Sequence, residues 1–199
     1  WHEFVMITSK LARENGIKTL YKSAFYIEMA PVLELIEVID IFSLSLKSMN
    51  PEFYRKQSKG ELQPTLDVIK AVYDSGAHLE ISQLVIPELN DHNDDIEKTV
   101  DWVLGNLDRY VPLHFVGFHP AYKYTHVERT PLSKLEMAYE ISKEKGIEYC
   151  YLGNVYKNGA SDTHCKGCQA KLVTRFGLKS KITNLDQQGI CTQCGVLSP

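Results

Sequence analysis

The sequence predicts an α/β protein with parallel strands that is followed by a small metal-binding module. Short apolar runs alternate with helical patterns over most of the chain, and four cysteines stand in two close pairs near its end. Strands that alternate with helices imply a parallel sheet with right-handed crossovers. We therefore assign residues 1–156 to the α/β domain and residues 157–199 to the module.

Helical patterns open the chain and recur between the apolar runs. Phe4, Ile7 and Leu11 lie on one face of a first helix, which Gly16 should end. Pro in a first turn and Gly just past a helix end are the usual punctuation of such helices. On this basis the later helices should begin near Pro31, Leu62, Asp94 and Pro131.

Five apolar runs predict the strands, at residues 17–21, 41–46, 77–86, 113–118 and 147–152. Five strands are too few for a closed eight-stranded barrel. The periodicity leaves open whether they form a small doubly wound sheet or part of a barrel.

The module is defined by two C-x2-C pairs, Cys165 with Cys168 and Cys191 with Cys194. Two such pairs can direct four thiolates at one tetrahedral cation, and Gly167 and Gly195 allow the tight turns this needs. Disulfides and ordinary buried thiols are the alternatives. Disulfides are disfavoured, because no segment of the sequence resembles a signal peptide. The spacing predicts a structural metal site, with zinc preferred over an auxiliary iron–sulfur cluster.

Composition narrows the classes of partner. The formal net charge of −3 gives no global attraction to nucleic acid. No apolar segment approaches the roughly 20 residues that span a bilayer. We expect a cytoplasmic protein without a membrane partner. The first residue is Trp1 rather than methionine, which suggests a piece of a longer protein.

Polar residues in or just after the predicted strands are the candidate site residues, because parallel α/β folds bind ligands beyond the carboxyl ends of their strands. Lys47, Asn90-Asp91, His119 and Asn154 follow strands. Each also has a structural interpretation: a solvated lysine, helix-capping residues or a turn histidine. Cys150, in an apolar strand, is expected to be a small core residue.

Glu80 and His114 are more unusual, since titratable groups inside apolar strands must be paired or must face a site. No G-x-G-x-x-G, P-loop or G-x-S-x-G motif occurs in the sequence. Their absence argues against the commonest classes of nucleotide-binding protein and hydrolase.

Several segments together resemble the AmmeMemoRadiSam-type radical SAM proteins, which are relatives of pyruvate formate-lyase activating enzyme. The segments are Leu46-Lys47, Phe53-Tyr54-Arg55, residues 78–81, 84–91, 112–115 and 118–123, Thr130-Pro131, and residues 151–155, and the cysteine pairs fit that family's tail. The resemblance implies the later part of a partial (β/α)6 barrel with a zinc-ribbon-like module. It also implies binding of S-adenosylmethionine (SAM) beside a [4Fe-4S] cluster and its reductive cleavage to a 5′-deoxyadenosyl radical.

The resemblance assigns cofactor binding to Lys47, Glu80 and His114, with Lys47 on the carboxylate of SAM and His114 on its nucleoside or sulfonium side. The family's C-x3-C-x2-C cluster motif does not occur in these 199 residues, so catalytic residues stay unassigned. Ser23-Ala24 stand where the family usually has Asn-Gly, and Ser45 stands where activating enzymes usually have Asp.

Three functions follow as hypotheses. The first is the C-terminal portion of a radical SAM protein of the activating-enzyme type, completed by a partner protein or by an N-terminal segment supplied in trans. The second is a non-catalytic, metal-stapled scaffold descended from that family. The third is a metal-dependent hydrolase that uses Glu80, His114 and His119. The substrate leaves no signature in the residues.

Overall fold

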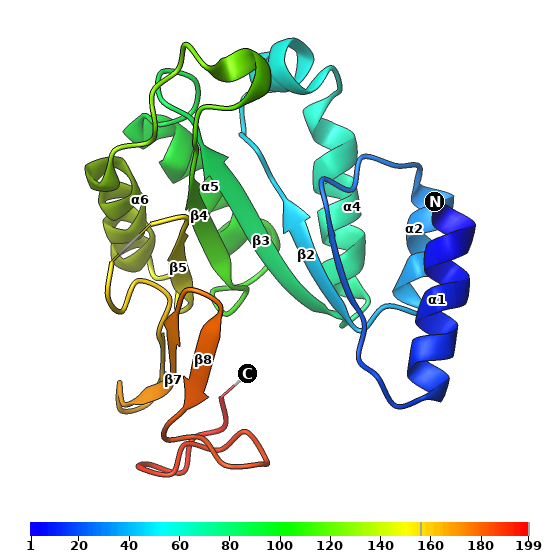
Figure 1. The fold of residues 1–199 in the computed structure, drawn as a ribbon, viewed down its shortest axis with the longest axis vertical. Helices are drawn as coiled ribbons and strands as arrows, with labels where there is room; N and C mark the ends of the chain where they lie inside the picture. Colours follow the sequence, from blue (N-terminus) through cyan, green and yellow to red (C-terminus); the bar gives the residue numbers. More distant parts are fainter. Residues whose placement is uncertain (156, 199) are drawn as a thin grey trace.

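The computed structural model describes residues 1–155 and 157–198, and the predicted boundary at residue 156 falls outside them. Within these ranges the chain forms a large parallel sheet and a small antiparallel sheet (Figure 1). The large sheet contains β1 (Leu20–Ser23), β2 (Ile41–Ser45), β3 (His78–Val85), β4 (Leu113–Gly117) and β5 (Cys150–Gly153). The small sheet contains β6 (Thr163–His164), β7 (Lys171–Phe176) and β8 (Lys179–Ile182).

Five longer helices accompany the large sheet. They are α1 (His2–Glu14), α2 (Met29–Ile36), α4 (Leu62–Asp74), α5 (Asn93–Asn106) and α6 (Leu132–Lys145). A short helix, α3 (Pro51–Phe53), continues as one π-helical turn, η1 (Tyr54–Ser58), and η2 (Tyr122–Tyr124) is a 3-10 turn. No helix among the described residues is long and apolar enough to cross a membrane.

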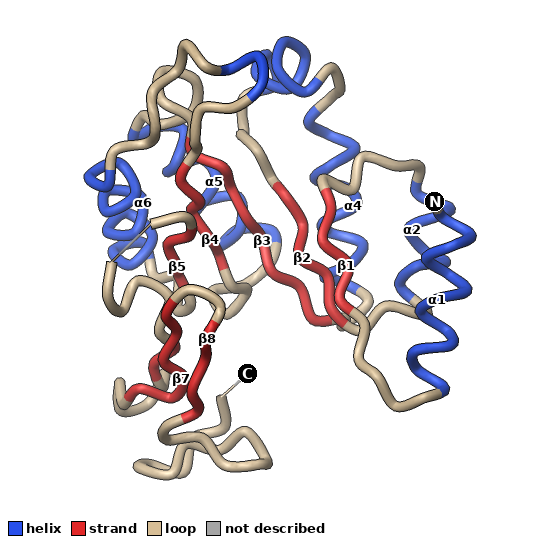
Figure 2. Tube along the Cα trace, viewed as in Figure 1, coloured by secondary structure: helices blue, strands red, loops and turns tan. Residues whose placement is uncertain are grey.

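The order of the strands excludes the doubly wound sheet, one of the two topologies that periodicity left open. The five strands lie in chain order, β1-β2-β3-β4-β5, and every neighbouring pair is parallel. A doubly wound sheet reverses its order at a switch point, and this sheet does not. Right-handed crossovers without a reversal place the helices along one side of the curved sheet, as Figure 2 shows.

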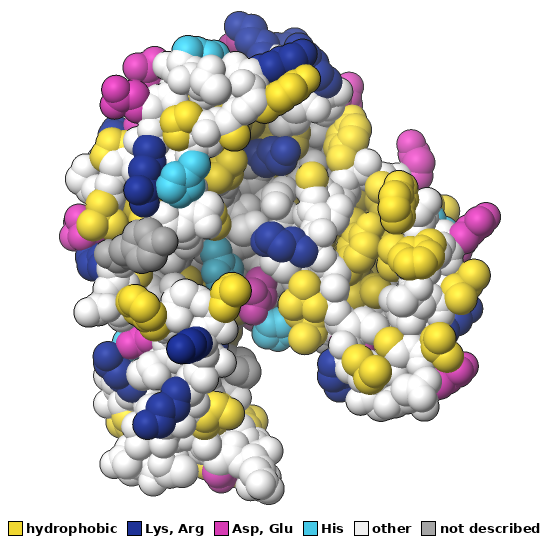
Figure 3. Space-filling model, viewed as in Figure 1, with side chains coloured by type: hydrophobic (Ala, Val, Ile, Leu, Met, Phe, Trp, Pro, Cys, Tyr) yellow, Lys and Arg dark blue, Asp and Glu magenta, His cyan; other side chains and the backbone are white. Residues whose placement is uncertain are grey.

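The two faces of the large sheet differ in polarity, because successive side chains of a strand point to opposite faces. Phe42, Leu44, Ile81 and Phe115 are fully buried in the core on the helix side. The opposite face carries a polar set, which consists of Lys22, Ser43, Ser45, Glu80, Ser82, His114 and Tyr151. Figure 3 shows basic, acidic and histidine side chains gathered in the hollow of the molecule.

Two strands, β1 and β5, begin three residues later than predicted. Gly16 and Gly146 end the preceding helices with φ values of +70° and +104°. After each, the backbone N–H of Ile17 or Ile147 donates to the carbonyl oxygen five residues earlier, at 2.9 Å. This 6→1 bond closes the helix end, so both isoleucines belong to helix caps rather than to strands.

The module has a small core of its own. Leu172 packs with Cys165 and Cys191 at its centre, and all three are buried. The sequence did not predict the antiparallel strands β6, β7 and β8, which surround this core. A core of three buried residues is too small to stabilise a module by itself, so an additional stabilising element, such as a bound metal ion, is needed.

Candidate metal centre and polar face

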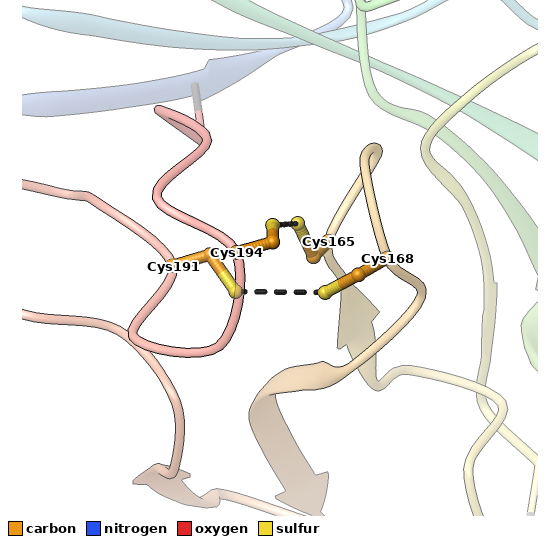
Figure 4. Close-up of side chains that lie close together, drawn as sticks. All are labelled: Cys165, Cys168, Cys191 and Cys194. Carbon is orange, nitrogen blue, oxygen red and sulfur yellow. Dashed lines mark hydrogen bonds between the residues drawn. The ribbon is translucent and has the colours of Figure 1, made fainter.

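The four predicted cysteines come together at one point of the module (Figure 4). The sulfur atoms of Cys165, Cys168, Cys191 and Cys194 all lie within 4.8 Å of one another. Cys165 Sγ is 3.5 Å from Cys194 Sγ, and Cys168 Sγ is 3.8 Å from Cys191 Sγ. These distances are too long for disulfides, whereas a tetrahedral site with metal–sulfur bonds of about 2.3 Å has sulfur–sulfur edges of about 3.8 Å. The geometry is that of a metal-binding site.

Local backbone geometry directs the sulfurs inward. Each C-x2-C turn is closed by a backbone bond back to its first cysteine: Gln169 N–H donates to the Cys165 carbonyl at 2.9 Å, and Gly195 N–H donates to the Cys191 carbonyl at 2.8 Å. Gly167 is required for space, because an added Cβ would lie 2.8 Å from Cγ2 of Val196. Gly195 is required for conformation, with a φ of +74°.

The electrostatics of the centre favour a bound cation. The backbone N–H of Cys168 donates to the Cys165 sulfur, which lowers the pKa of that thiol to about 7. The N–H of Val196 acts in the same direction on Cys194, but Cys168, burial and the other two sulfurs raise its pKa to about 12. Four neighbouring thiols cannot all ionise without a positive charge between them, and a metal supplies that charge.

Glu80 is the centre of the polar face. Its carboxylate lies between His78 Nε2, at 3.4 Å, and His114 Nε2, at 3.1 Å. The His114 contact is an ion-pair distance without hydrogen-bond geometry. The two imidazoles, His114 foremost, hold the pKa of Glu80 far below its usual range. On its other side His114 packs on the ring of Tyr151, with centroids 5.0 Å apart. The predicted pair therefore does come together.

Lys47 lies at the other end of the same face, beyond the carboxyl end of β2. Its backbone N–H donates to the hydroxyl of Tyr54 at 3.1 Å, and its carbonyl accepts from Asn90 Nδ2 at 2.7 Å. Glu80 pairs with Ser43, four residues before Lys47. At about 3.3 Å per residue, Lys47 and Glu80 are separated by roughly 13 Å along the strand direction.

The remaining polar candidates have structural roles. Asn90 is fully buried and joins the ends of β2 and β3, whereas Asp91 accepts from the backbone N–H of Glu88 at 2.9 Å. Asn154 donates to the Gly117 carbonyl at 3.1 Å. Cys150 is buried, and desolvation raises the pKa of its thiol to about 12, as suits a core residue.

His119 is exposed beyond β4 and takes no part in the Glu80 cluster. Among the described residues, the four cysteines are the one group of three or more His, Cys, Asp or Glu side chains spaced to hold a metal. The three residues named for the hydrolase hypothesis are therefore not brought together among the described residues.

A cavity of about 920 Å³ lies between the large sheet, at the amino ends of β3 and β4 and along β5, and the cysteine module. Glu80, His114, Tyr149 and Tyr151 line it from the sheet, and Thr163 and Arg175 line it from the module. Sequence reasoning missed this cavity. No spacing in the sequence signals it, because its walls come from segments that meet only in the folded chain.

No family model matches the chain. It is 38% identical over 196 residues to an uncharacterized protein of Methanocaldococcus jannaschii, a match that covers 98% of the chain and 58% of that protein. It is 28% identical over 105 residues to the (2S)-3-sulfopropanediol dehydratase activating enzyme of Klebsiella oxytoca, which covers 53% of the chain and 33% of the enzyme. The benzylsuccinate synthase activating enzyme of Thauera aromatica is 22% identical over 161 residues, or 72% of the chain and 49% of the enzyme. The chain thus spans about half the length of the curated relatives it matches, or less.

Solved structures agree with these relatives on the fold. A domain of pyruvate-formate lyase-activating enzyme from Bacteroides vulgatus superposes with a TM-score of 0.68 at 14% identity, covering 77% of the chain and 91% of the domain. SuiB from Streptococcus suis, solved with S-adenosylmethionine bound, gives 0.61 at 15% identity over 76% of the chain and 36% of SuiB. Two of these relatives and the Bacteroides vulgatus structure are thus activating enzymes, and the parallel sheet of the chain has the radical SAM domain fold.

Proposed function

We propose that the chain is the later part of a partial (β/α)6 barrel of the AmmeMemoRadiSam type, and that it works with a cluster-binding segment in the reductive cleavage of SAM. The observation that supports this most is the singly wound parallel sheet, combined with sequence similarity to two activating enzymes. On the described residues, β1 is an edge strand. Further strands of a barrel would pair with that edge.

The polar face is where SAM would bind. Lys47 would face its carboxylate, and His114 would lie toward its nucleoside or sulfonium side. Two hydrogen bonds hold the backbone of Lys47, so the position from which its side chain extends is fixed. Glu80 would contact the same molecule only if SAM extended roughly 13 Å down the face. We therefore propose Lys47 as the principal contact, with Glu80 and His114 at the far end.

The residues of this chain do not fit a [4Fe-4S] cluster of the radical SAM kind. Such a cluster needs three thiolates and one open iron position. Cys150 is buried with a raised pKa, and the other four cysteines face one another in the module. The cluster, which reduces SAM to the 5′-deoxyadenosyl radical, would be held by residues outside this sequence. The part of this chain is to bind and orient SAM.

The four-cysteine centre would hold zinc in a structural role. Four protein thiolates complete a tetrahedron and leave no position for a substrate. The module also has too few buried residues to be stable without a staple. An auxiliary iron–sulfur cluster at the same cysteines is the alternative occupant.

One observation favours the scaffold hypothesis as a second candidate. Ser45 stands where an acidic residue is expected, and its hydroxyl lies 3.3 Å from that of Ser82 rather than toward a ligand. Without this carboxylate, the polar face would bind a cation more weakly, which favours the scaffold.

The decisive experiment mixes the chain, under anaerobic conditions, with the part of the archaeal relative that it does not match, after loading iron and sulfide. Dithionite and SAM are added, and 5′-deoxyadenosine is measured by chromatography. The proposal predicts formation of 5′-deoxyadenosine that depends on the chain and falls with Lys47→Ala. No chain-dependent product from a folded, cluster-loaded mixture would support the scaffold instead.

A further inference from the structure

The cavity between the sheet and the cysteine module has the dimensions of a small-molecule site. Its volume of about 920 Å³ falls within the range of roughly 300–1,000 Å³ that ligand pockets occupy. Lys47 is not among its lining residues. Its lining from β3 does not extend to the carboxyl-end edge where Lys47 lies.

One wall of this cavity is anionic. Glu80 is half-buried, and its carboxylate is held ionised by His114 and His78. The other two acidic residues in the lining are already used: Asp108 accepts from the hydroxyl of Tyr73 at 2.9 Å, and Asp74 pairs with Lys70. Glu80 Oε1 accepts from His78, but in the part of the chain that the structure describes Oε2 has only the His114 contact, which lacks hydrogen-bond geometry, so Oε2 can receive a new hydrogen-bond donor.

The opposite wall is cationic. Arg175 Nη1 donates to the Ser161 carbonyl at 2.8 Å and to Thr163 Oγ1 at 2.7 Å, and these bonds fix the guanidinium. Within the described residues its Nη2 and Nε atoms make no hydrogen bond, and no carboxylate lies within ion-pair distance of the guanidinium. A fixed guanidinium with free donors is suited to a carboxylate.

Aromatic side chains connect the two walls. The guanidinium carbon of Arg175 lies 5.7 Å from the ring centroid of Tyr151, and the same ring packs on His114. The Tyr151 hydroxyl lies 2.9 Å from Thr163 Oγ1, which closes the chain of contacts. Beside it, Tyr149 is 95% buried, and its hydroxyl faces Ser198 without a hydrogen bond of good geometry. A buried hydroxyl of this kind calls for a partner.

These groups select among ligand classes. A simple anion would satisfy Arg175 but face Glu80, and a simple cation would satisfy Glu80 but face Arg175. An apolar ligand would displace water from Glu80 Oε2 and from the free guanidinium donors of Arg175 without giving either group a new partner. A molecule with one positive and one negative end satisfies both walls and leaves its body against the tyrosines.

We propose that the cavity between the large sheet and the cysteine module binds a small zwitterion of the amino-acid or dipeptide class, with its ammonium group on Glu80 and its carboxylate on Arg175. The module then has a function beyond its own fold, since it supplies the cationic wall. This site shares Glu80 and His114 with the far end of the proposed SAM site but does not include Lys47, so the two proposals can be tested separately.

The test is a titration of the chain, followed by calorimetry and by the imidazole NMR signals of its histidines. The probes are glycine, L-methionine, L-phenylalanine, L-lysine, glycylglycine and glycyl-L-phenylalanine, and the half-ligands acetate and methylammonium serve as ligand controls. At least one zwitterion should bind with roughly millimolar or better affinity and shift the signals of His78 and His114. Acetate and methylammonium should bind at least about tenfold more weakly.

Matched variants locate the site. Glu80→Gln and Arg175→Gln should each weaken binding by about tenfold or more, because each removes one charge-assisted contact. Lys181→Gln, on the same hairpin but outside the cavity lining, should leave binding unchanged. Lys47→Ala should also leave it unchanged, which separates this site from the proposed SAM site. Thermal unfolding of each variant verifies that it is folded.

The proposal would be overturned if the half-ligands bound as tightly as every zwitterion, or if no probe shifted the histidine signals. Loss of binding in Lys47→Ala would also overturn it, because the ligand would then occupy the carboxyl-end edge.

Discussion

Replacing Asn90 with alanine should be among the most destabilising single changes at the carboxyl ends of β2 and β3. Asn90 is fully buried, and its side chain makes three hydrogen bonds to backbone groups. Its Oδ1 accepts from Ile86 N–H at 2.6 Å, and its Nδ2 donates to the carbonyls of Lys47 and Leu84 at 2.7 and 2.9 Å. At about 1 kcal/mol net for each bond, with backbone groups left unpaired, Asn90→Ala should lower the free energy of unfolding by about 3 to 4 kcal/mol.

That loss is a large part of a typical domain's stability of about 5–15 kcal/mol. Urea unfolding followed by circular dichroism measures it, provided that the m-value is unchanged. Asn90→Asp should be at least as damaging, since a carboxylate would face two carbonyl oxygens. The matched control is Asn93→Ala at the exposed start of α5, which should stay within about 0.5 kcal/mol of the parent. An Asn90→Ala protein within 1 kcal/mol of the parent would refute the assigned role of these bonds.

Four further predictions concern the metal, the cofactor, pH and the surface. Protein purified without added metal should carry one zinc per chain by elemental analysis. The Cys168→Ala variant should lose the zinc and unfold the segment after Ser161, whereas the control variant Cys150→Ala should keep it. A parent protein without metal would count against the site. The chain alone should bind SAM weakly, and the Lys47→Ala variant should bind it more weakly still. A sub-micromolar dissociation constant for the parent chain in calorimetry would contradict the proposal that SAM binding needs a cluster held outside this sequence. Because the folded-state pKa of Glu80 is depressed, stability should fall as the pH drops below about 5, and Glu80→Gln should flatten that loss in acid unfolding curves. The part due to Asp40 should remain, since the Thr19 N–H and Lys18 lower the pKa of that carboxyl to about 2. Unchanged curves would argue against the Glu80–His114 pair. Trp1, at the N-cap of α1, and Phe4 and Ile7 on α1 are exposed, and we propose that this surface binds a second copy of the chain. Phe4→Lys with Ile7→Lys should reduce self-association in light scattering, and a parent protein that is monomeric at all concentrations would contradict the proposal.

Much of the parallel α/β part could be read from local sequence. Apolar runs of strand length between helical patterns placed all five strands, because each must bury one face against helices. The errors at β1 and β5 arose where Ile17 and Ile147 continue an apolar run but close a helix end. Hydrophobicity cannot distinguish these two uses of an isoleucine.

The metal centre was also determined by sequence alone, since the C-x2-C spacing constrains the turn that brings each pair of sulfurs together. Glu80 and His114 could be identified as a pair because titratable residues are unusual inside apolar strands. Which other residues would lie near this pair could not be predicted from the sequence. Register places Glu80 opposite Ser43, roughly 13 Å from Lys47, and the fold of the module brings Arg175 to the same cavity. Such neighbours are set by strand pairing and by the packing of distant segments. They are properties of the tertiary structure, because no local pattern in the chain encodes which residues will face one another across a sheet or between a sheet and a module.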